Sequence, residues 1–406
     1  MGVSQIHALG RNRKFFVNEE TTYIDSENIA TQGIKPIGTD AATVLNASFT
    51  PAQERKVRDD ARSSRSALEQ ITGKKSASWT VESYVLPSGS QGVAPNLGPL
   101  FKGVMGTETV TSSTRVTYSL NTNQDLGSFT LTQFFNDTFM ETLTGCYVNS
   151  MTISVAGGEE PKVTFDGESS GLYIPTTSSP NTSQANAGET FATVDGGGTS
   201  ATFNVHTGEG KNFRPGSVIS IGADRNKIVR SVSGDAITVD SSFNFADDDD
   251  VKPCAPDSTD TPAFTTAGSP IAGILGSLVL AGASDPLPIT SFEVTVANNN
   301  KAISDEAFVA GTSDYVPGFR DVTGSLSIRC RRDLAIEIGR RLDFGTQSIL
   351  VTCGDTAGKK LIIEIDDAEF EVAAVETPQS DEVVIPMSFR ALATSDGEDE
   401  IVIKFE

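Results

Sequence analysis

Apolar and polar residues alternate over most of this chain, in short segments separated by Gly, Asn, Asp and Pro. Alternation with a period of two places successive side chains on opposite faces, which is typical of half-buried β-strands. In the first half the pattern predicts strands in SASWTVESYVL, STRVTYSLN, SFTLTQFF, CYVNSMTISVAGG and PKVTFDGESSG. In the second half it predicts strands in GSLVLAG, TSFEVTVANN, VTGSLSIR, SILVTC, KKLIIEIDDAEFEVAAV and EVVIPMSFRAL. The chain is therefore expected to be all-β.

One segment has helical periodicity instead. Leu334, Ile338 and Leu342 recur every four residues, and Gly345 is a natural helix stop. The sequence thus predicts one packed α-helix over residues 331–345, against a β-sandwich or barrel.

Composition divides the chain into three parts. A linker rich in Ser, Thr, Asn and Pro covers 173–188, and a similar stretch, CAPDSTDTPAFTTAGSP, follows later. Between them, short apolar runs are spaced by Gly turns, as in a small barrel or sandwich. We expect 191–257 to be an inserted β-domain within a larger domain made of 1–190 and 258–406. The first 48 or so residues hold few clear elements, apart from a candidate strand in TTYIDS, and are expected to form an extended N-terminal arm.

Charge is distributed unevenly. The formal net charge is -22, which disfavours specific binding to nucleic acid, although an acidic balance can serve solubility alone. Between Glu54 and Lys75, however, seven basic residues stand against four acidic ones, whereas Ile362 to Glu406 holds thirteen acidic residues and two basic ones. The basic stretch is a candidate contact for an acidic partner surface, and its alternative is a solvated, partly helical loop. The candidate contact residues are Arg55, Arg58, Arg62, Arg65, Lys74 and Lys75.

The sequence contains little that suggests catalysis or a cofactor. With two histidines, a histidine-based triad or metal cage is nearly excluded, and the four cysteines are too far apart to indicate a zinc site or a disulfide framework. The run Asp247, Asp248, Asp249 and Asp250 is a weak calcium candidate without the usual loop register, and an exposed acidic loop is the stronger reading. We expect no catalytic residue, no cofactor and no enzyme.

Membrane insertion is not expected either. The most apolar run, PIAGILGSLVLAGA, is too short and too rich in Gly to span a bilayer, and the first residues lack the apolar core of a signal peptide.

The order of these segments resembles the major tail tube protein family of long, non-contractile-tailed bacteriophages. The likeness lies in the Arg-rich stretch FTPAQERKVRDDARSSRSALEQITGKKSASWTVESYVLPSG and the apolar PNLGPLFKGVMG. It continues in GCYVNSMTISVAGGEEPKVTFDGESSGLYI, SFEVTVANNNKA and GFRDVTGSLSIR.

The resemblance implies a structural virion protein of the tail, assembled in the host cytoplasm as stacked hexameric rings. Double-stranded DNA would pass through the tube without specific binding, and the basic stretch would reach an adjacent ring. It also implies a tape-measure protein, a tail terminator and baseplate or distal tail proteins as partners. The alternatives are a distal tail or tail-end ring protein of the same fold, or a secreted β-sandwich adhesin or carbohydrate-binding protein. Against the last, Trp79 lies in a strand pattern and fits a core position better than a sugar platform.

Overall fold

The computed structural model describes residues 13–25, 28–58, 66, 70–122, 126–135, 139–173, 192–253, 268–273, 276–280, 289–304, 311–329, 346–372, 383–394 and 397–406. The helix predicted over 331–345 lies outside these residues, as do most of both predicted linkers.

Strands dominate the described chain and confirm the all-β prediction. The first part holds β1 (Arg13–Glu19), α1 (Ile29–Gln32), β2 (Ala41–Ala42), β3 (Asn46–Val57), β4 (Gln70–Tyr84), α2 (Gly98–Met105), β5 (Thr107–Thr111), β6 (Arg115–Ser119), β7 (Phe129–Phe135), β8 (Phe139–Ala156), β9 (Lys162–Ser169) and β10 (Gly171–Tyr173). The middle part holds β11 (Ala192–Thr193), β12 (Gly198–Asn204), β13 (Val218–Ile221), β14 (Asp224–Ser233), β15 (Ala236–Phe245) and β16 (Asp250–Pro253). The last part holds β17 (Gly276–Leu280), β18 (Ile289–Ala297), β19 (Lys301–Ile303), β20 (Asp314–Val316), β21 (Asp321–Arg329), β22 (Gln347–Cys353), β23 (Leu361–Val372), β24 (Val384–Leu392) and β25 (Val402–Phe405).

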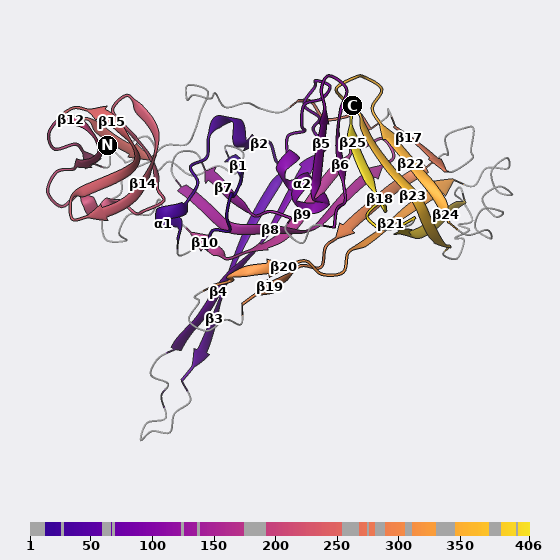
Figure 1. The fold of residues 1–406 in the computed structure, drawn as a ribbon, viewed down its shortest axis with the longest axis horizontal. Helices are drawn as coiled ribbons and strands as arrows, with labels where there is room; N and C mark the ends of the chain where they lie inside the picture. Colours follow the sequence, from indigo (N-terminus) through magenta and orange to yellow (C-terminus); the bar gives the residue numbers. More distant parts are fainter. Residues whose placement is uncertain are drawn as a thin grey trace, which may run out of the picture.

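The longest run of paired strands forms one antiparallel sheet, which we call the main sheet. Its order in space is β3-β4-β9-β8-β18-β21-β24-β23. It extends from the hairpin of β3 and β4 at the lower left of the molecule to β24 at the right (Figure 1). Alternation places Trp79, Phe165 and Val294 on the buried face, where each is at most 2% exposed.

Two strands of the main sheet also belong to a second layer. The first half of β8 pairs with β7 and β10, and β7 continues the layer to β1 and β2. The first half of β23 pairs with β22 and β25, which lead to β17 on one side and to β6 and β5 on the other. Side chains of both layers meet in one large hydrophobic cluster. Within it, Phe101 of α2 packs against Phe165 and Phe405, with ring centroids 5.1 and 5.3 Å apart. The molecule is therefore a sandwich whose layers share strands.

The six strands from β11 to β16 form a separate sheet with its own hydrophobic cluster, seen at the left of Figure 1. This sheet contacts the rest of the chain through polar and apolar groups. Lys35 Nζ lies 3.0 Å from Asp240 Oδ2, and Arg230 Nη1 donates to the Gly33 carbonyl at 2.8 Å. Val218 completes a small buried cluster that includes Phe16 from β1 and Phe134, Met140 and Ala41. The six-stranded sheet is thus attached to the body by packing as well as by chain connections.

The N-terminal part differs from its sequence-based expectation. Instead of an extended arm, Arg13–Glu19 is β1, which pairs with β7 along its whole length and buries Phe15, Phe16 and Val17. The described residues of TTYIDS form no strand. A strand buried on both faces has no alternation, so periodicity gives no signal for it.

Candidate functional site

A long hairpin projects from the body and is the most distinctive surface of the molecule (Figure 1). β3 and β4 pair over its length, and its inner part is fixed by Trp79 and Val81, which are 2% and 0% exposed. Its outer part, Pro51–Val57 with Gln70–Gly73, is exposed on both faces. Two large apolar side chains, Val57 and Ile71, are 51% and 54% exposed there. An arm of this kind has no core of its own, and exposed apolar side chains of this size are typical of surfaces that contact another molecule.

The hairpin contains a bulge near its middle. The pairing register shifts between Gln53 and Arg55, where Gly73 and Lys74 of β4 lie opposite the single residue Glu54 of β3. Gly73 lies opposite, and a Cβ atom there would come within 2.8 Å of Glu54 Cβ. The missing side chain at Gly73 therefore makes room for the bulge, which increases the local twist and directs the outer part of the arm.

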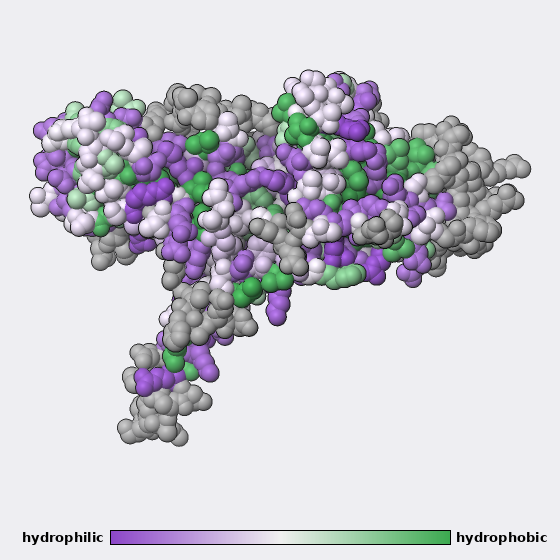
Figure 2. Space-filling model, in the orientation of Figure 1, coloured by the Kyte–Doolittle hydropathy of each residue, from purple (hydrophilic) through white to green (hydrophobic). Residues whose placement is uncertain are grey.

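Basic side chains lie along this arm, and hydrophilic residues cover much of its described surface (Figure 2). Arg55, Arg58 and Lys75 are exposed, and Lys74 is half-buried, with its Nζ donating to the carbonyl of Ser304. The structure therefore brings four of the six predicted contact residues onto one arm. Arg62 and Arg65 lie outside the described residues.

An acidic strand lies at the opposite end of the main sheet. The second half of β23 carries Asp366, Asp367, Glu369 and Glu371, and it pairs with β24 on one side. β22 pairs with its other side as far as Ala368, and beyond that point no strand of the described chain pairs with residues 369–372 on this side. β3 is likewise paired on one side alone among the described strands. The main sheet thus ends in a basic edge and an acidic edge, and an unpaired edge is a ready surface for adding a further strand.

The open face of the main sheet is lined by small hydroxyl side chains and by scattered acidic and basic groups, among them Arg390, whose Nη2 lies 2.8 Å from Asp321 Oδ1. Thr152 and Thr295 face each other across β8 and β18, with their Oγ1 atoms 2.9 Å apart. Glu293 in β18 is exposed, between Ser154 and Ser325 on the neighbouring strands. This face can stay in contact with water, and it carries no large apolar group at these positions.

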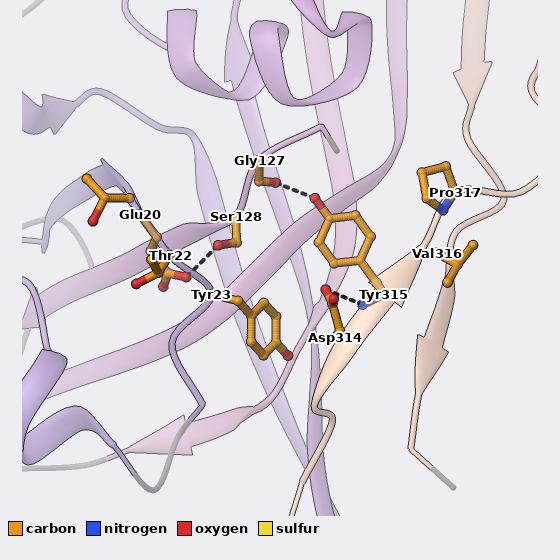
Figure 3. A pocket seen from close by; sticks show the side chains of 10 residues that line it. Glu20, Thr22, Tyr23, Gly127, Ser128, Asp314, Tyr315, Val316 and Pro317 are labelled. Carbon is orange, nitrogen blue, oxygen red and sulfur yellow. Dashed lines mark hydrogen bonds between the residues drawn. The ribbon is translucent and has the colours of Figure 1, made fainter. Parts of the chain in front are cut away.

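A cavity of about 590 Å³ lies beside this face, between the end of β1 and the β20 strand (Figure 3). The Glu20 carboxylate accepts hydrogen bonds from Ser128 Oγ at 2.6 Å, Thr130 Oγ1 at 2.7 Å, Gly145 N at 2.9 Å and Ile24 N at 3.1 Å. Burial nevertheless raises its pKa. These four bonds join β1, β7 and β8, so we assign the carboxylate a structural role.

A ring stack closes the same region. Tyr147 of β8 and Tyr315 of β20 are stacked with centroids 4.4 Å apart, and the Tyr315 hydroxyl donates to the Gly127 carbonyl at 2.7 Å. The β19–β20 segment is thereby held against the sheet. The cavity's lining is explained by bonds that hold strands together, and it offers no arrangement of nucleophile and base.

The four consecutive aspartates do not converge on one point. Asp247 Oδ1 accepts from Gly196 N at 2.7 Å, Asp249 Oδ2 accepts from Ala246 N at 2.7 Å, and Asp250 lies 3.1 Å from Lys252 Nζ. Their oxygens thus stabilise a turn instead of forming one cation cage.

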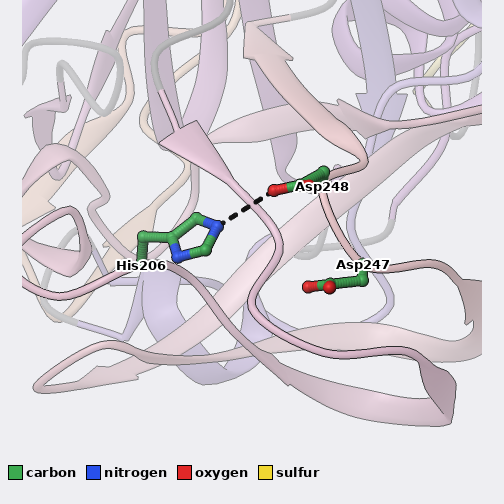
Figure 4. A group of neighbouring side chains, drawn as sticks. All are labelled: His206, Asp247 and Asp248. Carbon is green, nitrogen blue, oxygen red and sulfur yellow. Dashed lines mark hydrogen bonds and ion pairs between the residues drawn. The ribbon is translucent and has the colours of Figure 1, made fainter.

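A different combination comes together nearby. His206 Nε2 lies 3.2 Å from Asp248 Oδ1, and ligand atoms of His206, Asp247 and Asp248 all lie within 4.8 Å of one another (Figure 4). The Asp248 carboxylate raises the pKa of this exposed histidine. An exposed ion pair accounts for the geometry, and sequence spacing gave no signal for His206.

The described cysteines are buried. Cys146 and Cys353 are free thiols, and burial raises the pKa of the Cys146 thiol and raises that of Cys353 to about 11. A thiol held protonated in this way is a poor nucleophile and fits a packing role. Among the described residues no helix has the length and apolar character needed to cross a membrane.

Comparisons with known proteins agree with a structural role. A family model described as "Phage tail tube protein" matches residues 10–210 and 230–391, which is most of the chain. The unmatched interval, 211–229, lies inside the six-stranded sheet. A search of curated proteins finds no match.

Proposed function

Because the chain belongs to the phage tail tube protein family and is thus a structural component of the virion tail, we propose that it self-assembles into stacked rings that form the tube. The rings are expected to contain six tube-forming units, and the tube conducts double-stranded DNA during ejection. Assembly takes place in the host cytoplasm. The further partners are a tape-measure protein, a tail terminator and baseplate or distal tail proteins.

The observation that carries this proposal is the shape and lining of the main sheet. Eight antiparallel strands lie in one sheet, with a buried face and an open face that carries hydroxyl groups, several acids and the Arg390 guanidinium, which is paired with Asp321. Such a face suits the wall of a channel, because carboxylates repel phosphates and small hydroxyl groups offer DNA few strong contacts. The basic arm is outside this face, where it reaches a neighbouring subunit.

The first test is electron microscopy of the purified protein over a range of concentrations, with and without a preparation of tail ends to nucleate growth. Hollow tubes of stacked rings are expected. Rings that never stack would favour a distal tail or tail-end protein instead. Monomers under both conditions, combined with glycan binding, would favour an adhesin.

The channel assignment has its own test. Substituting Glu293→Lys places a cation on the open face, and we expect assembled virions to eject DNA more slowly because the cation attracts phosphate. The matched control is Glu160→Lys, which has the same charge change in the exposed turn between β8 and β9. Ejection at the wild-type rate in both variants would contradict the assignment of this face to the channel.

A further inference from the structure

The strands outside the six-stranded sheet repeat one arrangement twice. In chain order, β1, β3, β4, β7, β8, β9 and β10 correspond to β17, β18, β21, β22, β23, β24 and β25. In the first set β1 pairs with β7, β3 with β4, β4 with β9, β7 with β8, β8 with β9, and β8 with β10. The second set has the same six pairings in the same order, all antiparallel. The main sheet is therefore two four-stranded sheets of one topology, joined where β8 meets β18.

The repeat extends to an irregularity of register. In the β7–β8 ladder five consecutive pairs precede a shift, after which Phe129 pairs with Cys146. In the β22–β23 ladder five consecutive pairs precede the same shift, after which Gln347 pairs with Ala368. In both pairs of strands the second strand, β8 or β23, carries one extra residue at this shift. A shared bulge at an equivalent position is hard to explain unless both halves have the same local design.

An aromatic ring over a glycine also recurs. A Cβ on Gly167 of β9 would come within 2.6 Å of the Trp79 ring on the paired position of β4. In the second half the residue types are exchanged, because a Cβ on Gly324 of β21 would come within 2.3 Å of the Phe389 ring on β24. Each four-stranded sheet therefore has one glycine and one aromatic residue at the equivalent cross-strand pair, with the ring lying against the glycine.

This repeat changes the division of the chain. The sequence-based division has one tube domain interrupted by an insert at 191–257. The pairings instead place one tube repeat in 13–173 and another in 276–406, with the six-stranded sheet on the connection between them. β6 of the first repeat, which also pairs with β5, pairs with β25 of the second repeat and so joins the two repeats.

The two repeats meet where β8 pairs with β18, and this pairing shows which partner strand each outer edge of the main sheet lacks. The last residues of β8 pair with β18, so that Ser150 is opposite Ala297, and the next residues, Asn149 and Asn298, share a backbone hydrogen bond of 2.8 Å. The equivalent strands at the outer edges are the end of β23 and β3. Neither has that partner among the residues that the structure describes.

We propose that the end of β23 pairs with β3 of a second copy of this chain, in the way that β8 pairs with β18. The inference rests on the proposed ring and names the contact that closes it. Matching the two repeats places Val372 opposite Ala52 of the neighbouring copy and Glu371 beside Gln53 of that copy. Each ring then holds an even number of repeats, and a ring of six repeats contains three chains instead of six.

Charge supports this choice of partner. Beyond Gln53, β3 carries Arg55, and before Glu371, β23 carries Glu369, which follows the part of β23 that pairs with β22. In an antiparallel pair these segments run side by side, so the basic arm of one copy extends along the acidic edge of the next. Opposite charges across a strand pair are favourable, and like charges at both edges would oppose closure.

Paired cysteines test the contact in assembled tubes. The test variant carries Ala52→Cys with Val372→Cys, and a second carries Gln53→Cys with Glu371→Cys to allow for a one-residue difference in register. The matched control carries Ser150→Cys with Ala297→Cys, the same contact inside one chain. After mild oxidation, non-reducing electrophoresis measures the size of the linked species, with Ala52→Cys alone as background.

The control should link within single chains, and at least one test variant should give a ladder that ends at three chains. A ladder ending at six chains would overturn the two-repeat ring. Tubes that show no linked species in either test variant would overturn the edge pairing while leaving the proposed function standing. Tubes are scored by electron microscopy in the unsubstituted protein, so their absence there counts against the proposed function itself.

Discussion

At the scale of single residues, the two ring-over-glycine pairs show how strongly the main sheet constrains its sequence. Gly324 lies against Phe389, and a Cβ there would also come within 2.4 Å of the Glu293 carbonyl oxygen. Both neighbours are fixed, since one is backbone and the other is a ring that is 3% exposed.

We therefore expect Gly324→Ala to lower the free energy of unfolding by about 1–3 kcal/mol, as overpacking of a well-packed core does. The measurement is urea unfolding followed by the fluorescence of Trp79, the one tryptophan in the chain. Gly276→Ala is the control, because its Cβ would meet only Thr352 O, at 3.7 Å. Equal stability of the two variants would show that the ring can move away.

Glu20 gives the stability a pH dependence. Burial raises the pKa of its carboxyl in the folded state above the ordinary value of 4.5. A raised folded-state pKa means that the stability contribution is complete below the unfolded-state pKa and is lost as pH rises through the folded-state value. Glutamine does not titrate, so Glu20→Gln removes this dependence.

The free energy of unfolding of the wild type minus that of Glu20→Gln is therefore expected to be larger at pH 5 than at pH 8. The change amounts to about 1.4 kcal/mol for each tenfold difference in the acid dissociation constant of Glu20 between the folded and unfolded states. Urea unfolding at both values measures it, and Glu160→Gln, an exposed carboxyl, serves as control. A difference that grows with pH would contradict the assignment.

At the scale of elements, the basic hairpin is expected to control assembly without stabilising the fold of one chain. Reversing Arg55, Lys56 and Arg58 to Glu should raise the protein concentration needed for tube growth by about 10-fold or more, since charge complementarity across interfaces is typically worth 1 kcal/mol or more. Light scattering measures the threshold.

Lys211→Glu with Arg214→Glu and Lys359→Glu is the matched control for this charge reversal, because these three basic side chains are exposed and lie away from the hairpin. The unfolding midpoint of the hairpin variant should equal that of the wild type. A hairpin variant that assembles at the wild-type threshold would show that the arm does not bind a neighbouring subunit.

Sequence patterns found the elements that have one buried face. The alternation in β4, β9 and β21 follows directly from their burial, and each was predicted. β3 was missed because its outer residues are exposed on both faces, and β1 was missed because it is buried on both. Period-two analysis can detect neither case.

The sequence predicted the basic residues of the candidate site but not the hairpin that carries them. Arg55, Arg58, Lys74 and Lys75 were found as a basic stretch, but charge alone does not show that they lie on a hairpin. The tube repeat was not detected in the sequence, because it is a property of strand pairing. Its shared features use different residues, such as Trp79 in one half and Phe389 in the other.

At the scale of the whole molecule, the proposed edge pairing would make one chain an arc of a closed barrel. In that arrangement the main sheet would provide the wall and the hairpin and β23 the contacts between chains, while the six-stranded sheet attaches to the body through the Val218 cluster. The six-stranded sheet is then expected on the outside of the tube, since the open face of the main sheet faces the channel.

The most direct test of this central claim is a cryo-electron microscopy reconstruction of assembled tubes at a resolution that separates strands. The main sheets of successive chains are expected to join in one continuous barrel, with Glu293 facing the channel and the six-stranded sheet outside. A channel lined by the six-stranded sheet, or main sheets that do not touch, would contradict it.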